Sequence, residues 1–195
     1  MRTRSRLWAT LALGLLAIAA AACARDEPAT PRPVTTTGPE SAALALTVTS
    51  SAFEEGAAIP VRFTCDGEDV SPDLSWSRPP EGTVSIALVV DDPDAPRGVF
   101  THWVAYGLPA IAGGMPEGVA PRPKGAGFYG KNDFGKTGYR GPCPPKGSPH
   151  TYRFTVYALD ASPGLESDAS QADLFEAIDG HVIARGRLTG EYKRP

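Results

Sequence analysis

Between residues 44 and 192, apolar positions recur mostly at every second residue, which is the period of β-strands with one buried face. The pattern predicts strands at residues 44–50, 61–63, 74–76, 83–92, 100–108, 151–160 and 182–192. On three of these strands the apolar faces are expected to be Val84, Ile86, Leu88 and Val90; Phe100, Val104 and Tyr106; and Tyr152, Phe154 and Val156. Many strands joined by turn-forming residues are typical of a mainly β fold.

One helix is expected over residues 172–179, with Ser170 as N-cap and Gly180 as C-cap. Its buried stripe consists of Leu174, Phe175 and Ile178. The region 109–149 has no sustained period and is rich in Gly and Pro. Loops of this length are uncommon in compact domains unless they are functional or disordered. Aromatic residues favour an ordered, packed loop here, namely Phe128, Tyr129, Phe134 and Tyr139.

Length and composition fit one globular domain with an additional terminal segment. The chain has 195 residues, of which 42% are hydrophobic and 21% charged, with 21 Gly and 20 Pro. Its formal net charge is −3, which becomes −6 when the three arginines in residues 1–22 are removed. Such an acidic domain lacks the basic footprint of nucleic-acid binding, and no polybasic segment would hold it on anionic lipid.

The N-terminus has the features of a secretion signal. Three arginines precede an apolar run, residues 7–22, that ends in small residues before Cys23 and is short for a transmembrane span. The stretch LAIAAAAC resembles the bacterial lipoprotein signal, in which the cysteine is acylated and becomes the new N-terminus, although Ala20 stands where that signal most often has Leu. Plain secretion after cleavage at a nearby A-x-A site is the alternative.

These features predict the organisation of the whole chain. Residues 1–22 are expected to be a signal peptide, with Cys23 lipidated and the protein anchored outside the cytoplasm in a bacterial envelope. Residues 23–42 are rich in Pro and Thr and would form a flexible tether to a domain at residues 43–195. With Cys23 lipidated, Cys65 and Cys143 form an even pair in an oxidising compartment, where we expect a disulfide. Two free thiols are the alternative.

Three ionisable residues extend the predicted apolar faces at strand ends. Counting every second residue, Asp92 continues the face of 83–92, His102 lies on that of 100–108, and His150 lies on that of 151–160. A short antiparallel connection brings Asp92 and His102 to one edge of the sheet, and the long loop can bring His150 there. The sequence thus predicts a small cleft lined by two imidazoles and a carboxylate. For each residue alone, an ordinary structural histidine or an Asp-Pro turn is the alternative.

Two other functions would use the same cluster. Asp92, His102 and His150 have the donor types of a non-haem iron or open zinc site, although no HxxxH or HxH spacing is present. A hydrolase is the third hypothesis, since Ser148 lies two residues before His150, but no G-x-S-x-G elbow occurs. Binding without catalysis or cofactor is the preferred interpretation. Asp91 and Arg97 are interpreted as solvent-facing turn residues.

Long motifs around these residues resemble the phosphatidylethanolamine-binding protein family, in its bacterial Raf-kinase-inhibitor-like branch. The motifs are FTCDGEDVSPDLSW, DDPDAP followed by FTHW, and GYRGPCPPKGSPHTYRFTVYALD, and the match covers most of residues 44–193. The resemblance implies an antiparallel β-sandwich with Greek-key connections and a small anion pocket at one end. It implies proteins that bind phosphorylated head groups or inhibit kinases or proteases.

The resemblance also implies which residues form the pocket. They are Asp92, Asp94, His102, Gly141, Pro142, His150 and Tyr152. His181 matches nothing in the pocket and is interpreted as structural. The expected function is an envelope-anchored, non-catalytic protein that binds a small anion, of phosphate or phospholipid head-group type, and acts as an inhibitor or regulator of a kinase or protease.

Overall fold

The structure is a computed structural model that describes residues 44–110, 113–119 and 127–195. The expected signal peptide, Cys23 and the tether lie outside these residues. Within the described ranges, no helix is long and apolar enough to cross a membrane.

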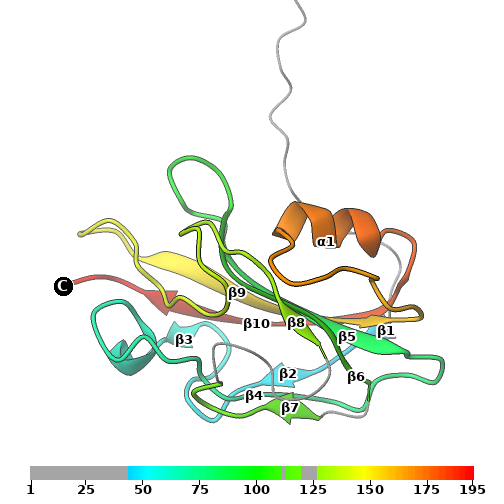
Figure 1. The fold of residues 1–195 in the computed structure, drawn as a ribbon. Helices are drawn as coiled ribbons and strands as arrows, with labels where there is room; N and C mark the ends of the chain where they lie inside the picture. The colour runs from blue at the N-terminus through cyan, green and yellow to red at the C-terminus, as the bar shows by residue number, and fades with distance from the viewer. Residues whose placement is uncertain (1–43, 111–112, 120–126) are drawn as a thin grey trace, which may run out of the picture. The chain divides into compact units, whose positions relative to one another are not determined.

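A large sheet of seven strands forms the centre of the domain (Figure 1). Its strand order is β1-β10-β9-β5-β6-β8, and β3 also pairs with β10. The bounds are β1 Leu44–Ala45, β3 Ala57–Ala58, β5 Ser85–Asp92, β6 Phe100–Pro109, β8 Phe128–Tyr129, β9 His150–Leu159 and β10 Val182–Tyr192. The pairs are antiparallel except for β1 and β3, which each pair with β10 in parallel.

The topology is the predicted Greek key. Strands β5, β6 and β8 are successive antiparallel neighbours, and β9 then returns to lie beside β5 on the far side from β6. A second sheet of three strands has the order β2-β4-β7, with bounds Val48–Thr49, Leu74–Trp76 and Gly114–Met115. The mainly β fold with one short helix is therefore confirmed.

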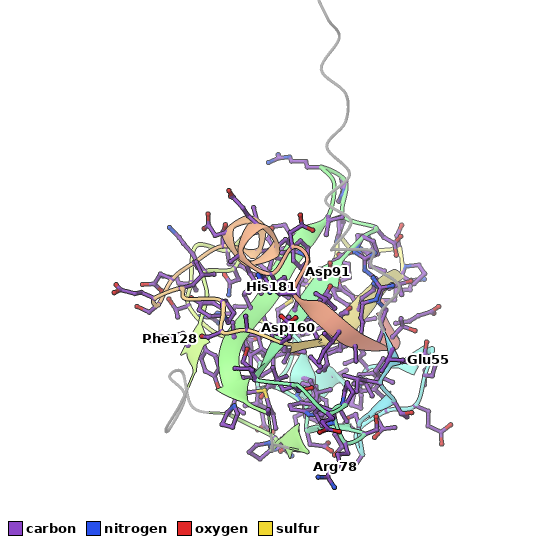
Figure 2. All side chains as sticks on the ribbon, turned by 90° about the vertical axis from the view of Figure 1, so that its right-hand side faces the viewer. Glu55, Arg78, Asp91, Phe128, Asp160 and His181 are labelled. Atoms are coloured by element: carbon purple, nitrogen blue, oxygen red, sulfur yellow. A yellow bond between two sulfur atoms is a disulfide. The ribbon has the colours of Figure 1, made fainter. Side chains whose placement is uncertain are left out.

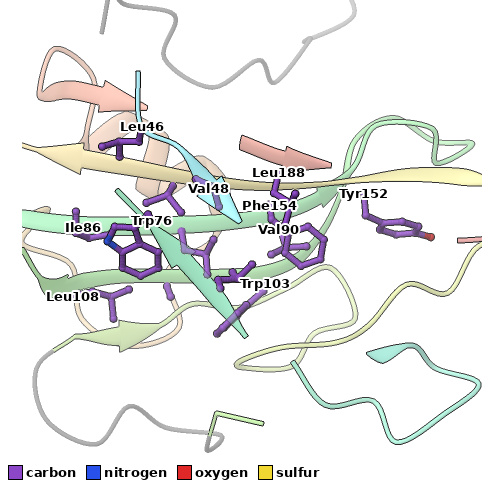
Figure 3. Close-up of a cluster of buried hydrophobic side chains, with 14 of the residues drawn as sticks. Leu46, Val48, Trp76, Ile86, Val90, Trp103, Leu108, Tyr152, Phe154 and Leu188 are labelled. Carbon is purple, nitrogen blue, oxygen red and sulfur yellow. The ribbon is translucent and has the colours of Figure 1, made fainter. Parts of the chain in front are cut away.

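Two apolar layers cover the two faces of the large sheet. The layer between the sheets contains Ile86, Leu88 and Val90 from β5 together with Val48 and Trp76 from the small sheet (Figure 3). On the opposite face, α1 (Gln171–Ala177) packs Leu174 against Ala87 and Val89. Because β5 is buried on both faces, its sequence is almost continuously apolar.

The predicted helix and its N-cap are confirmed, but α1 ends at Ala177 with Ile178 as C-cap, and Phe175 is only partly buried. Ser170 caps α1, since its side chain accepts the N–H of Asp173 at 3.2 Å while the Asp173 carboxylate accepts the N–H of Ser170 at 2.8 Å. Leu174 and Ile178 are fully buried, and Gly180 has a positive φ of 76° just beyond the helix.

Three strand predictions near the N-terminal end of the domain were wrong in detail. Residues 61–63 form a turn of 3₁₀-helix after Pro60, closed by the N–H of Phe63 on the Pro60 carbonyl at 3.0 Å. The segment 44–50 is divided between β1 and β2, which pair with different sheets. Val84 precedes β5 and is 57% exposed, so it does not belong to the buried face.

The face assignment of β6 was also wrong, and the reason is a β-bulge at His102. Val90 pairs with Trp103 but Asp91 pairs with Thr101, so His102 is the extra residue on β6. Beyond the bulge, Trp103 and Ala105 face the layer between the sheets, whereas Val104 and Tyr106 face α1.

Candidate functional site

A pocket of about 580 Å³ lies at the end of the large sheet where β5, β6 and β9 come together. Three predicted residues line it, namely Asp92, His102 and His150. The loop 95–99 and Phe100 form one part of the wall, and the long loop contributes Asp133, Phe134 and the segment 143–145. The Asp133 carboxylate accepts the N–H of Thr101 at 2.6 Å. The structure thus brings together the two imidazoles and the carboxylate that the alternation of residues along the strands placed at one edge of the sheet.

His150 is held by Asp92 across the β5–β9 pair. Its Nδ1 lies 2.7 Å from Oδ2 of Asp92, and both side chains are almost fully buried. Since a carboxylate only accepts hydrogen bonds, Nδ1 carries the hydrogen, and Nε2 is the ring nitrogen left for other partners. The other oxygen of Asp92 accepts the N–H of Asp94 at 2.8 Å, which fixes the carboxylate in turn.

His102 is held in the same manner by the backbone. Its Nδ1 donates to the carbonyl oxygen of Arg140 at 2.8 Å, and its ring makes edge-to-face contacts with Phe100, Phe134 and Tyr152 at centroid distances of 5.2–5.3 Å. Burial lowers the pKa of His102 below its usual 6.5, although the Arg140 carbonyl opposes this change. An empty pocket therefore favours the neutral ring with its hydrogen on Nδ1.

The other four predicted residues do not line this pocket but support its walls. Asp94 is exposed and accepts the N–H of Thr151 at 2.8 Å, which ties the loop after β5 to the start of β9. Pro142 is buried and accepts the N–H of Cys65 through its carbonyl at 3.1 Å. Gly141 is buried where a Cβ atom would lie 2.2 Å from the Phe63 carbonyl oxygen.

Tyr152 packs behind the pocket, at the end of the core beyond Phe154 and Val90 (Figure 3). Its hydroxyl is buried and has no hydrogen-bond partner among the residues that the structure describes. Burial, together with the nearby Asp92 carboxylate, raises the pKa of Tyr152 far above its usual value, so the phenol stays protonated. Tyr152 therefore positions the His102 ring through packing.

The predicted disulfide between Cys65 and Cys143 is present, with Cα atoms 5.4 Å apart. Cys143 lines the pocket, so the bond fixes one part of its wall to the loop after Phe63. His181 lies at the opposite end of β9 from His150 and pairs with Asp160 at 2.8 Å (Figure 2). Its structural interpretation fits this position.

Asp91 is not the solvent-facing turn residue that the sequence suggested. It is 6% exposed and pairs with Arg153 through both oxygens, with Oδ1 to Nε at 2.6 Å and Oδ2 to Nη2 at 2.8 Å. Gln171 of α1 also approaches Asp91 at 3.3 Å and accepts from Thr101 at 2.5 Å. This buried polar group lies on the α1 face, behind the pocket. The sequence around Asp91 did not indicate a partner on β9, which neighbours β5 in the sheet but lies 62 positions away along the chain.

Arg97 is exposed as expected, but it also lines the pocket. Phe100 and Phe134 are further pocket residues that sequence reasoning did not assign to the site. Their signal was weak, because an apolar residue at the start of a strand, such as Phe100, or an aromatic residue in an irregular loop, such as Phe134, is compatible with ordinary packing. Phe134 is 42% exposed, which distinguishes it from the buried aromatics of the core.

The geometry bears on the metal and hydrolase hypotheses. No group of three or more His, Cys, Asp and Glu side chains suited to a metal ion occurs among the described residues. Ser148 is exposed, and the described contacts contain no hydrogen bond between it and His150. Neither hypothesis gains a specific observation from the structure.

Comparisons with known proteins identify relatives of this chain. The family described as phosphatidylethanolamine-binding protein matches residues 49–193. The UPF0098 protein of Methanothermobacter thermautotrophicus is 46% identical over 151 residues, which are 76% of this chain and 99% of that protein. A Mycobacterium tuberculosis protein that carries the lipoprotein name LppC is 40% identical over 161 residues, 82% of this chain and 78% of that protein.

Solved structures show the same fold. The Escherichia coli protein YbcL, described as a new member of the mammalian PEBP family, superimposes with a TM-score of 0.73 at 34% identity. A PEBP homologue from Chlamydia trachomatis gives a TM-score of 0.72 at 38% identity. Each alignment covers 77% of this chain and 99% of the other. Together with the match over residues 49–193, these similarities show that the chain belongs to the phosphatidylethanolamine-binding protein family.

Proposed function

We propose that this member of the family is a non-catalytic binding protein whose pocket takes a small anion of phosphate or phosphorylated head-group type. One observation carries the proposal: His102 and His150 both use Nδ1 within the protein, and both rings line one pocket. Each Nε2 therefore remains as the ring nitrogen for a ligand. A protonated imidazole donates from Nε2 to an anion oxygen, whereas the neutral ring has a lone pair there.

Anion binding at such a site is coupled to proton uptake. Burial already disfavours the charged form of His102, and a neighbouring anion favours it. The liganded pocket therefore binds protons more readily than the empty one, and by linkage the anion binds more tightly as pH falls. The Asp92 carboxylate fixes the His150 ring, and its own charge makes a dianion unfavourable unless the imidazoles are protonated.

The experiment is a calorimetric titration of the full chain with sodium sulfate between pH 5 and 8 at constant ionic strength. Sulfate stays dianionic over this range, so the pH dependence reports on the protein. We expect the affinity for sulfate to fall as pH rises, by up to tenfold per pH unit for each proton taken up on binding. His102→Gln and His150→Gln should remove most of the affinity, whereas His181→Gln, outside the pocket, should retain it.

A flat pH profile, or an equal loss in the His181→Gln control, would overturn the proposal. Elemental analysis of the same samples distinguishes the metal alternative. Stoichiometric metal in the unaltered protein that is lost in His102→Gln would favour a metal site over an anion pocket.

We further propose that a lipid on Cys23 holds the domain at the outer side of a bacterial membrane. The signal resemblance and the lipoprotein name of a 40% identical relative support this. At that surface the pocket would meet phosphorylated head groups or the phosphorylated side chains of a kinase or protease, which it would then inhibit or regulate. Incorporation of an alkyne-tagged fatty acid in a bacterial host tests the anchor. The label should disappear in Cys23→Ala but not in Cys65→Ala.

A further inference from the structure

A second, smaller cavity adjoins the pocket. It has a volume of about 310 Å³ and is lined by Cys65, Asp69, Phe134, Lys136, Arg140 and Gly141. Phe134 lines both cavities, and the disulfide contributes Cys143 to the first and Cys65 to the second. One aromatic ring and one disulfide therefore separate the two spaces.

The second cavity carries an excess of positive charge. Asp69 is already engaged, because its Oδ2 accepts from Nη1 of Arg140 at 2.6 Å and its Oδ1 accepts the N–H of Gly141 at 2.7 Å. This pair leaves Lys136, which is exposed and has no carboxylate within salt-bridge distance in the described part of the chain. The sum over Asp69, Arg140 and Lys136 is one positive charge.

Arg140 and Phe134 also link the two cavities, because each contacts groups that line both. The Arg140 carbonyl accepts from His102 of the first cavity, and its guanidinium pairs with Asp69, which lines the second cavity as Arg140 itself does. The centroid of the Phe134 ring lies 5.3 Å from that of His102, and Phe134 is 42% exposed, so it is accessible to a molecule that spans both spaces. A ligand that reaches from one cavity to the other would thus contact side chains that already bind or pack against one another, namely His102, Phe134 and Arg140.

We propose that the second cavity is a subsite for an acidic group at the distal end of a phosphorylated ligand. This inference rests on the anion-binding function proposed above, since the phosphate occupies the first pocket. The ammonium of Lys136 attracts a distal carboxylate and repels a distal ammonium. The ligand class is therefore the phosphoserine type, in preference to the phosphoethanolamine type. The same chemistry is present in a free phosphorylated amino acid and in a lipid head group.

Two matched pairs of probes test the subsite on the full chain. O-phosphoserine and O-phosphoethanolamine are monoesters that differ only in one carboxylate. Glycerophosphoserine and glycerophosphoethanolamine are the corresponding diesters of lipid head groups. We expect the serine member of a pair to bind about three- to fivefold more tightly, as for an exposed ion pair, and less so at high salt. A preference confined to the diesters would identify the lipid source, and one confined to the monoesters the free source.

The serine probes carry one more negative charge, so variants must locate the effect. Lys136→Gln should reduce the preference to about one, and Lys136→Glu should reverse it. Lys131→Gln removes the same charge from the same loop outside both cavities and should retain the preference. Equal affinities within both pairs, or equal losses in the two glutamine variants, would overturn the subsite while sulfate binding leaves the anion pocket intact. Failure of sulfate and of all four probes to bind would overturn both proposals.

Discussion

Removing the disulfide between Cys65 and Cys143 should destabilise the domain mainly by freeing the unfolded chain. The bond joins residues separated by 78 positions. For a loop of that length, chain entropy gives a stabilisation of about 4.5 kcal/mol at 25 °C. Other contacts hold the folded loops together, since the Cys65 N–H donates to Pro142 at 3.1 Å and the Tyr139 hydroxyl donates to the Phe63 carbonyl at 2.7 Å. The double alanine variant should therefore fold and lose about 3–4.5 kcal/mol of stability.

Urea unfolding at pH 7, followed by the fluorescence of the buried Trp76 and Trp103, measures this loss. Dithiothreitol should move the midpoint of the unaltered protein to that of the double variant and leave the variant unchanged. The dependence on urea should become steeper without the bond, because the unfolded chain exposes more surface. A loss below about 1 kcal/mol would refute the entropic reasoning, which assigns more than that even to short loops.

Three further predictions concern single residues, and urea unfolding measures each. Burial lowers the pKa of His102 in the folded state, so the unfolded chain binds more protons just below pH 6.5. The free energy of unfolding should therefore fall as pH drops through that value, and added sulfate should restore it. A pH profile that His102→Gln leaves unchanged would contradict this. Asp91→Asn leaves the guanidinium of Arg153 half-buried without its carboxylate and should cost about 3 kcal/mol, whereas a loss below about 1 would mean that water replaces the pair. Gly141→Ala should cost about 2 kcal/mol or more and weaken sulfate binding, because its Cβ would lie 2.2 Å from the Phe63 carbonyl oxygen; unchanged stability would show that this turn adapts.

Strict alternation predicted the elements that depend only on their own sequence. In β9, Tyr152, Phe154 and Val156 all face the layer between the sheets, and the capped helix begins one residue from its predicted start. The same reasoning failed in β6, because a bulge depends on the register with a neighbouring strand. The bulge at His102 changed the face of Val104, yet His102 itself still points into the predicted cleft.

The site could be predicted where the order of the residues along the chain was enough to bring them together. Asp92 ends β5 and His102 lies near the start of β6, so their proximity followed from a short connection between consecutive strands. The partner of Asp91 did not follow, because nothing in the sequence pairs it with Arg153, 62 positions away. Residues 61–63 have a strand-like composition, but they follow Pro60 and form a 3₁₀ turn closed by local hydrogen bonds, which the alternation of apolar residues does not reveal.

The consecutive residues Asp91 and Asp92 both bind side chains of β9, but on opposite faces of the sheet. Asp92 binds His150 on the pocket side, and Asp91 binds Arg153 on the α1 side. A protein engineer could therefore replace Asp92 and His150 by a different pair of ligand-binding residues, while the Asp91–Arg153 ion pair still joins β5 and β9. Over evolutionary time, the same separation would let ligand preference drift among relatives without loss of the scaffold.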